Sequence, residues 1–180
     1  DLHFIKGEYG QPCFKGAPAG FEGCGDVVAA GEKFQGLMGM RVAFSVSLGG
    51  SGAWADYAMT DGAICLPLRP DISDDDGSAQ IVNPLTAMAM VDIAKNAGDA
   101  FVISAATSQL GKLMIGLGKD LGLKTIALVR RHNAVEPLEA LGATEVLVTT
   151  DDDFESQMKT ASRAFKPRVF LDSVADQVSE

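Results

Sequence analysis

The sequence lacks several features that would point to particular classes of protein. Its 180 residues contain only 3 cysteines and 2 histidines. The cysteines, Cys13, Cys24 and Cys65, are odd in number and have no C-x-x-C spacing, which favours reduced thiols in a cytosol over a disulfide framework. Neither His3 nor His132 has partners at metal-ligand spacing, so the sequence predicts no metal site.

Long apolar runs and an excess of basic residues are also missing. No apolar run approaches the roughly 20 residues needed to cross a membrane, and residues 1–6 do not resemble a signal peptide. The net charge of −9 disfavours nucleic acid or an anionic membrane as the main partner. With the reduced thiols, these features lead us to expect a cytoplasmic protein.

What is present divides the chain into two parts. The first part is rich in Gly and Pro and carries short β-like runs, which predict an irregular antiparallel barrel with turns such as Gly49 to Gly52. These runs are 26–30, 41–46, 54–60 and 63–66. From about Pro84 helical and strand patterns alternate, which predicts a parallel α/β sheet. We expect one domain over 1–78 and a second over 79–180.

The second part contains a predicted strand–turn–helix–strand unit. Residues 101–104 and 125–129 are apolar runs suited to strands buried on both faces. Between them, an apolar stripe at helical spacing precedes Gly122, which is suited to a left-handed helix end. The stripe is Leu110, Leu113, Met114, Leu117 and Leu121.

The turn of this unit predicts a dinucleotide site. An abrupt turn into a helix presents backbone N–H groups and the positive dipole end, which suit a pyrophosphate. Of the G-x-G-x-x-G fingerprint only Gly111 is present, and Ala105 and Ser108 occupy earlier small-residue positions. The candidate cofactor-binding residues are Thr107, Ser108, Gln109, Leu110 and Gly111. The alternative is an ordinary crossover without a ligand.

Two arginines follow the second strand of the unit. Arg130 and Arg131 lie about 20 residues beyond Gly111, where an NAD enzyme usually carries an acid that binds the ribose. A guanidinium presents a planar fork suited to a 2′-phosphate. The pair therefore predicts NADPH as the cofactor, although such a pair is also common in a solvated loop.

The remaining elements are predicted from their caps and periodicity. We expect a helix over 84–97, with Asn83 as its N-cap, and a helix over 132–141 that ends at Gly142. A strand over 145–148, a helix over 151–165 and a strand over 168–172 follow. Three aspartates at 151–153 are interpreted as complementing the dipole of the helix that they begin.

The order of these motifs resembles the medium-chain dehydrogenase/reductase superfamily along essentially the whole chain. Residues 20–31 resemble its P-G-x-E-x-x-G-x-V-x-x-x-G segment, and 52–57 its G-x-[WY]-[AR]-[ED]-[YF] strand. Residues 79–87 are similar to the A-x-x-x-x-N-x-x-T-A segment of the zinc-free branch, and 141–143 to its L-G-A motif. The resemblance implies an α/β fold, a partial GroES-like β-barrel followed by a partial Rossmann domain.

Within the superfamily, residues 82–84 and the 104–111 turn look most like quinone oxidoreductases and enoyl-thioester reductases. Phe21 stands where zinc-dependent members carry a histidine ligand, which implies a zinc-independent enzyme. The resemblance also implies that Tyr9 is catalytic, since a phenol can protonate a developing enolate. It implies that Asn83 and Thr86 face the nicotinamide; a cap and a buried hydroxyl are their alternative roles.

The expected activity is NADPH-dependent hydride transfer to a quinone or to an activated C=C, in a 2-enoyl thioester or an enone. A non-catalytic nucleotide-binding fragment and a relative of the zinc-dependent alcohol dehydrogenases are the alternatives. Relative to the superfamily, the chain resembles an internal fragment without the last two nucleotide-domain strands. The full-length parent is expected to be a homodimer, because family members commonly dimerise through those strands.

Overall fold

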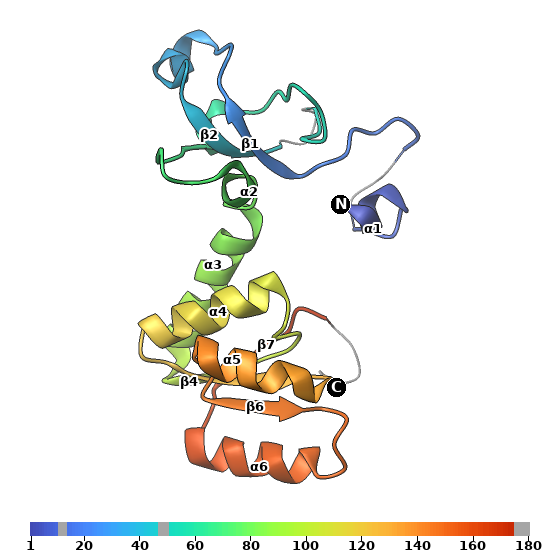
Figure 1. The fold of residues 1–180 in the computed structure, drawn as a ribbon, viewed down its shortest axis with the longest axis vertical. Helices are drawn as coiled ribbons and strands as arrows, with labels where there is room; N and C mark the ends of the chain where they lie inside the picture. The colour runs from blue at the N-terminus through green and yellow to red at the C-terminus, as the bar shows by residue number, and fades with distance from the viewer. Residues whose placement is uncertain (11–13, 47–50, 175–180) are drawn as a thin grey trace. The chain divides into compact units, whose positions relative to one another are not determined.

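The structure is a computed structural model, and it describes residues 1–10, 14–46 and 51–174. Cys13 and the Gly49–Gly50 part of the predicted turn lie outside these ranges. The chain divides into two compact units, Asp1–Val82 and Asn83–Glu180 (Figure 1). Within the described residues, none of the helices is both long and apolar enough to cross a membrane.

The first unit is built on a small antiparallel sheet. Its strands β1 (Glu22–Asp26), β2 (Arg41–Ser45) and β3 (Cys65–Pro67) lie in the order β1-β2-β3. The central strand β2 carries the buried side chains Val42 and Ala43. The short helices of this unit are α1 (Leu2–Ile5), η1 (Glu32–Leu37), η2 (Gly62–Ile64) and α2 (Asp74–Gly77).

Two strand predictions in this unit are wrong. The first strand is β1, which ends at Asp26, where the run predicted over 26–30 begins. The two glycines of this strand lower its β-propensity, and a Cβ at Gly23 would lie close to the Phe44 ring, at 3.3 Å. Residues 54–57 form bends and 58–60 are irregular, so this range contains no strand. Their start is held by two bonds, from the N–H groups of Ala53 and Trp54 to residues 19–20.

The second unit is a parallel sheet with helices on both faces. Its elements are α3 (Val82–Ala97), β4 (Ala100–Ile103), α4 (Gln109–Asp120), β5 (Lys124–Val129), η3 (His132–Ala134), α5 (Val135–Leu141), β6 (Glu145–Val148), α6 (Phe154–Phe165) and β7 (Val169–Leu171). The strand order is β6-β5-β4-β7, and each neighbouring pair is parallel. The chain therefore builds outward from β4 to β6 and then crosses to the other side of β4. This reversal between β4 and β7 is a topological switch point, where open α/β sheets bind ligands.

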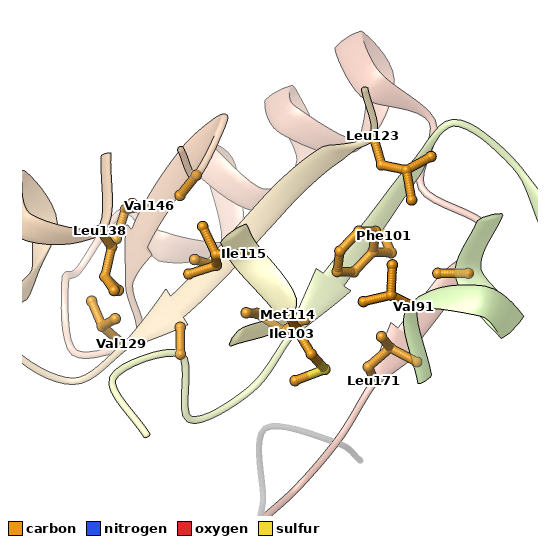
Figure 2. Close-up of a cluster of buried hydrophobic side chains, with 14 of the residues drawn as sticks. Val91, Phe101, Ile103, Met114, Ile115, Leu123, Val129, Leu138, Val146 and Leu171 are labelled. Carbon is orange, nitrogen blue, oxygen red and sulfur yellow. The ribbon is translucent and has the colours of Figure 1, made fainter. Parts of the chain in front are cut away.

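Alternate residues of the strands point to opposite faces and bury two cores. Phe101 and Ile103 of β4 pack with Val91 of α3 and Met114 and Ile115 of α4 (Figure 2). On the other face Val102 packs with residues of β5, β6 and α6, including Ile126, Leu128, Leu147 and Ala161. Burial on both faces explains why these strands are continuous apolar runs in the sequence.

The helices differ from the prediction in their starts and in one apolar stripe. Helix α5 begins at Val135, because residues 132–134 form the 3-10 helix η3. Helix α3 begins at Val82 instead of Pro84, so Asn83 is not its N-cap. Helix α6 begins at Phe154, and its N-cap Asp153 makes no side-chain capping bond. In α4 the predicted stripe is only partly buried, because Leu113 and Leu121 are exposed. Gly122 does end α4 as predicted, with a φ of +73°.

Candidate functional site

The turn between β4 and α4 lies at the carboxyl edge of the sheet, beside the switch point. Ser108 is the N-cap of α4, and its Oγ accepts a 3.0 Å hydrogen bond from the Gly111 N–H. A Cβ at Gly111 would lie 2.7 Å from the Ala106 carbonyl oxygen and 2.8 Å from that of Ala105. Only glycine therefore allows the first turn of α4 to approach the preceding turn so closely.

The predicted cofactor-binding residues of this turn surround the start of α4. Thr107 and Gln109 are exposed, Ser108 and Leu110 are half-buried, and Gly111 is buried. Among the described residues, no hydrogen bond occupies the backbone N–H groups of Gln109 and Leu110. Since N–H groups in a first helical turn point out along the axis, this end of α4 presents free donors at the crevice. Ala105, with a φ of +45°, supplies the sharp bend before it.

A polar link that the sequence analysis missed spans the switch point. The Ser104 hydroxyl donates a 2.5 Å hydrogen bond to Asp172 Oδ1 and accepts one of 2.9 Å from the Ser173 N–H. The same Asp172 oxygen accepts a 3.1 Å bond from the Val174 N–H. Ser104 is buried. A buried hydroxyl at the end of an apolar strand is a sequence signal for such a link, because buried polar groups need partners.

The loop after β5 carries the predicted arginines. Arg130 and Arg131 are both exposed, and neither takes part in an ion pair within the part of the chain that the structure describes. His132 Nε2 lies 2.9 Å from Asp151 Oδ1. The loops after β5 and β6 therefore meet beside the arginines.

The other predicted residues lie elsewhere. Asn83 and Thr86 are half-buried in the first turns of α3. The start of α3 is stabilised by Glu22, whose Oε2 accepts hydrogen bonds of 3.0 Å and 2.8 Å from the N–H groups of Ile81 and Val82. Tyr9 belongs to the first unit and is half exposed there. The turn and the arginines thus both lie at the carboxyl ends of the parallel strands, in the second unit. Tyr9 is part of the first unit.

Two aromatic side chains of the first unit pack against Phe21. The Phe21 ring lies 5.2 Å from that of Phe4 and 5.5 Å from that of Tyr9, measured between centroids. A phenylalanine has no donor atom for a metal ion. In the described residues, a search for clusters of three or more His, Cys, Asp or Glu side chains that would suit a metal ion found none.

The chain is similar in sequence and structure to several known proteins. No protein-family model matches it. It is 34% identical over 155 residues to the mitochondrial enoyl-(acyl-carrier-protein) reductase of Arabidopsis thaliana. The aligned region covers 81% of this chain and 40% of that protein. A crystal structure of a "putative NADPH:quinone reductase" from Mesorhizobium loti superposes with a TM-score of 0.93 at 48% identity, over 99% of this chain and 53% of that one. The complex of Etr1p with NADP and crotonyl-CoA has a TM-score of 0.79 at 25% identity, over 99% of this chain and 58% of that one.

The strand order, the switch point and the close turn define a Rossmann-type α/β unit that follows a GroES-like unit. With these relatives, the chain belongs to the medium-chain dehydrogenase/reductase superfamily. It spans about half the length of the relatives that it matches.

Proposed function

We propose that the protein is an NADPH-dependent oxidoreductase that transfers hydride to a quinone or to an activated C=C, without zinc. The close turn at Gly111, with two arginines in the loop after the neighbouring strand β5 that form no ion pair among the described residues, is the observation that carries the proposal. The names of its relatives support it, since they include an enoyl reductase, an NADPH:quinone reductase and a complex with NADP and crotonyl-CoA.

The residues of the β4–α4 turn fit a dinucleotide. The free N–H groups of Gln109 and Leu110 would hold the pyrophosphate at the N-terminus of α4, where the helix dipole also favours negative charge. A side chain at position 111 would push the helix away from this point. Arg130 and Arg131 would hold the 2′-phosphate. The bound cofactor supplies the hydride, and the protein positions it.

Zinc independence is supported by the cluster around Phe21. At the position of the zinc ligand, Phe21 presents only apolar carbon atoms, which pack against Phe4 and Tyr9. Without a Lewis acid, the substrate must accept hydride unaided. A conjugated carbonyl or a quinone does so, because the negative charge that develops is delocalised onto oxygen.

Tyr9 is the proposed proton source for reduction of an enoyl thioester. A phenol can donate a hydrogen bond to a developing enolate or protonate it. Its ring packs on Phe21 and remains half exposed, which leaves the hydroxyl open to a ligand. Asn83 and Thr86 are the proposed contacts of the nicotinamide end.

Binding of the two nicotinamide cofactors tests the cofactor assignment. Titration calorimetry should show that the protein binds NADPH more tightly than NADH. Replacing both Arg130 and Arg131 by Ala should weaken NADPH binding about tenfold or more and leave NADH binding nearly unchanged, since one charged hydrogen-bonding partner contributes roughly 1.5–3 kcal/mol. Equal losses for both cofactors would contradict the assignment.

Steady-state assays with a 2-enoyl thioester and a benzoquinone test the reaction. Tyr9→Phe should lower kcat for the thioester far more than for the quinone, because a quinone does not need an enolate to be protonated at carbon. NADPH binding without turnover of either substrate would instead support a non-catalytic nucleotide-binding module.

The proposal also covers the oligomeric state and the subcellular location of the protein. We expect a homodimer, which light scattering coupled to size-exclusion chromatography would detect. The low cysteine content favours the cytosol, whereas the Arabidopsis relative is named as mitochondrial. Imaging of the tagged protein in its own cells distinguishes the two compartments.

A further inference from the structure

The loops that follow β5 and β6 are joined beyond the ends of these two strands. The Thr149 N–H donates a 2.8 Å bond to the Val129 carbonyl, and the Thr150 hydroxyl donates a 3.5 Å bond to the Arg130 carbonyl. The third link is the 2.9 Å contact between His132 Nε2 and Asp151 Oδ1. Asp151 is thereby fixed next to the segment that carries both arginines.

Opposite charges meet at this junction. The loop after β5 contributes Arg130 and Arg131, and the loop after β6 contributes three consecutive aspartates, Asp151 to Asp153. Asp151 is the most buried carboxylate of the three, with 25% of its side chain exposed. The three aspartates, Glu155 and one cation, Lys159, line an open depression of about 540 Å³. A bound 2′-phosphate would therefore lie close to acids that repel it.

The His132 contact determines where the Asp151 carboxylate points. Nε2 lies 2.9 Å from Oδ1, so the imidazole ring stands directly against this carboxylate. Among the described residues neither arginine has an acidic partner. Asp151 is thus held by the histidine, while both guanidinium groups remain available for an anion.

We propose that His132 is a specificity-determining residue for the 2′-phosphate of NADPH, because it holds Asp151 away from Arg130 and Arg131. The inference rests on the NADPH preference proposed above. Without His132, the Asp151 carboxylate would pair with an arginine or face the phosphate directly. Both outcomes weaken NADPH binding and leave NADH, which has no 2′-phosphate, unaffected.

A double-mutant cycle measures this effect. His132→Ala, Asp151→Ala and the double variant are titrated with NADPH and with NADH by calorimetry. His132→Ala should raise the Kd for NADPH roughly three- to tenfold, as expected for one partly exposed charge near a phosphate. Asp151→Ala should keep or lower that Kd, and the double variant should match Asp151→Ala. The Kd for NADH should stay within about twofold throughout.

Two further variants show whether a loss of NADPH affinity is due to the contact between His132 and Asp151. His132→Gln keeps an N–H donor and should retain most of the NADPH affinity. His3→Ala removes the other histidine, which pairs with Glu8 at 3.1 Å on an exposed surface, and should change neither Kd. Circular dichroism confirms that each variant is folded, which is expected because the His132 side chain is 74% exposed.

The outcomes separate this inference from the proposed function. A His132→Ala loss that persists in the Asp151→Ala background, that affects NADH equally, or that is absent would overturn the role of His132. In that case, a selective loss of NADPH affinity in the Arg130 and Arg131 double variant would still support the proposed function, without a role for His132. If the wild-type protein shows no preference for NADPH, both conclusions are wrong.

Discussion

Ser104, at the carboxyl end of β4, donates its hydroxyl hydrogen to Asp172, which follows β7, over 2.5 Å. The two strands are neighbours in the sheet although 68 positions separate the residues in the sequence. Because Ser104 also accepts a bond from the Ser173 N–H, it fixes the first residues of the chain beyond β7. One buried hydroxyl therefore determines the geometry of the switch point, where the proposed crevice begins.

Ser104→Ala should destabilise the second unit. The substitution removes a hydrogen bond to a carboxylate, which contributes roughly 1.5–3 kcal/mol, and leaves a backbone N–H without its acceptor. Urea denaturation followed by circular dichroism measures the change in the free energy of unfolding. Asp172→Asn keeps an acceptor and should cost less than Ser104→Ala. An exposed serine of α6 provides the control, since Ser156→Ala should stay within about 0.5 kcal/mol.

The strands of the second unit were predictable because two-sided burial leaves a local signal. Strand β6 has the predicted limits, β4 lies one residue earlier than predicted at both ends, and β5 begins one residue earlier than predicted. Helix α5 ends before Gly142, as predicted, where a φ of +123° suits glycine. In each case a run of apolar residues or a glycine carries the information within a few positions of the chain.

The links that shape the site were not predictable in the same way. The pairs Ser104–Asp172 and His132–Asp151 join residues on different loops, and no local pattern specifies them. Strand β1 was missed because its stability comes from pairing with β2 instead of from the β-propensity of Glu-Gly-Cys-Gly-Asp. The start of α3 was misplaced because its capping group, Glu22, lies far away in the sequence.

Two glycines of α4 should respond in opposite ways to substitution by alanine. At Gly111 the added Cβ would overlap the backbone carbonyl of Ala106, so the helix start must move, at a cost of about 1–3 kcal/mol. At Gly116 nothing lies within 4 Å of the added atom, and the helix should gain roughly 0.5–1 kcal/mol.

Thermal and urea denaturation of the two variants measure these changes, and cofactor titration follows them. Gly111→Ala should also reduce NADPH affinity strongly, whereas Gly116→Ala should leave it unchanged. Since both substitutions add the same methyl group to one helix, they differ only in position. A Gly111→Ala protein with wild-type stability and affinity would show that the close approach is not needed.

Glu22→Ala should destabilise the start of α3. The carboxylate accepts bonds from two N–H groups and lies at the positive end of the helix dipole, which together contribute about 1–2 kcal/mol. Glu22→Gln keeps the acceptor oxygen but loses the charge and should cost about half as much. Glu139→Ala, on the exposed face of α5, is the matched control. Hydrogen exchange at the Ile81 and Val82 amides measures the effect locally, and unchanged protection in Glu22→Ala would contradict the capping role.

The Cys24 thiol should ionise at higher pH than a free cysteine. Burial is the main cause of its raised pKa, and the negative charge of Asp74 raises it further, while Arg41 acts in the opposite direction. The Sγ atom also donates to the Asp74 carbonyl at 3.3 Å, which favours the protonated form. Cys65 is shifted in the same direction, so the test uses a protein in which Cys13 and Cys65 are replaced by serine.

In that protein, the rate of alkylation by iodoacetamide should rise with pH through a midpoint above the ordinary thiol value of about 8.5. The pH of the midpoint reports the pKa, whereas slow access alone lowers the rate at every pH. Because the native state binds this proton more tightly than the unfolded state, its contribution to stability is complete below pH about 8.5 and is lost as the pH rises through the native pKa. Asp74→Asn should shift the midpoint downward, and a midpoint at or below that of a cysteine in the urea-unfolded protein would contradict the assignment.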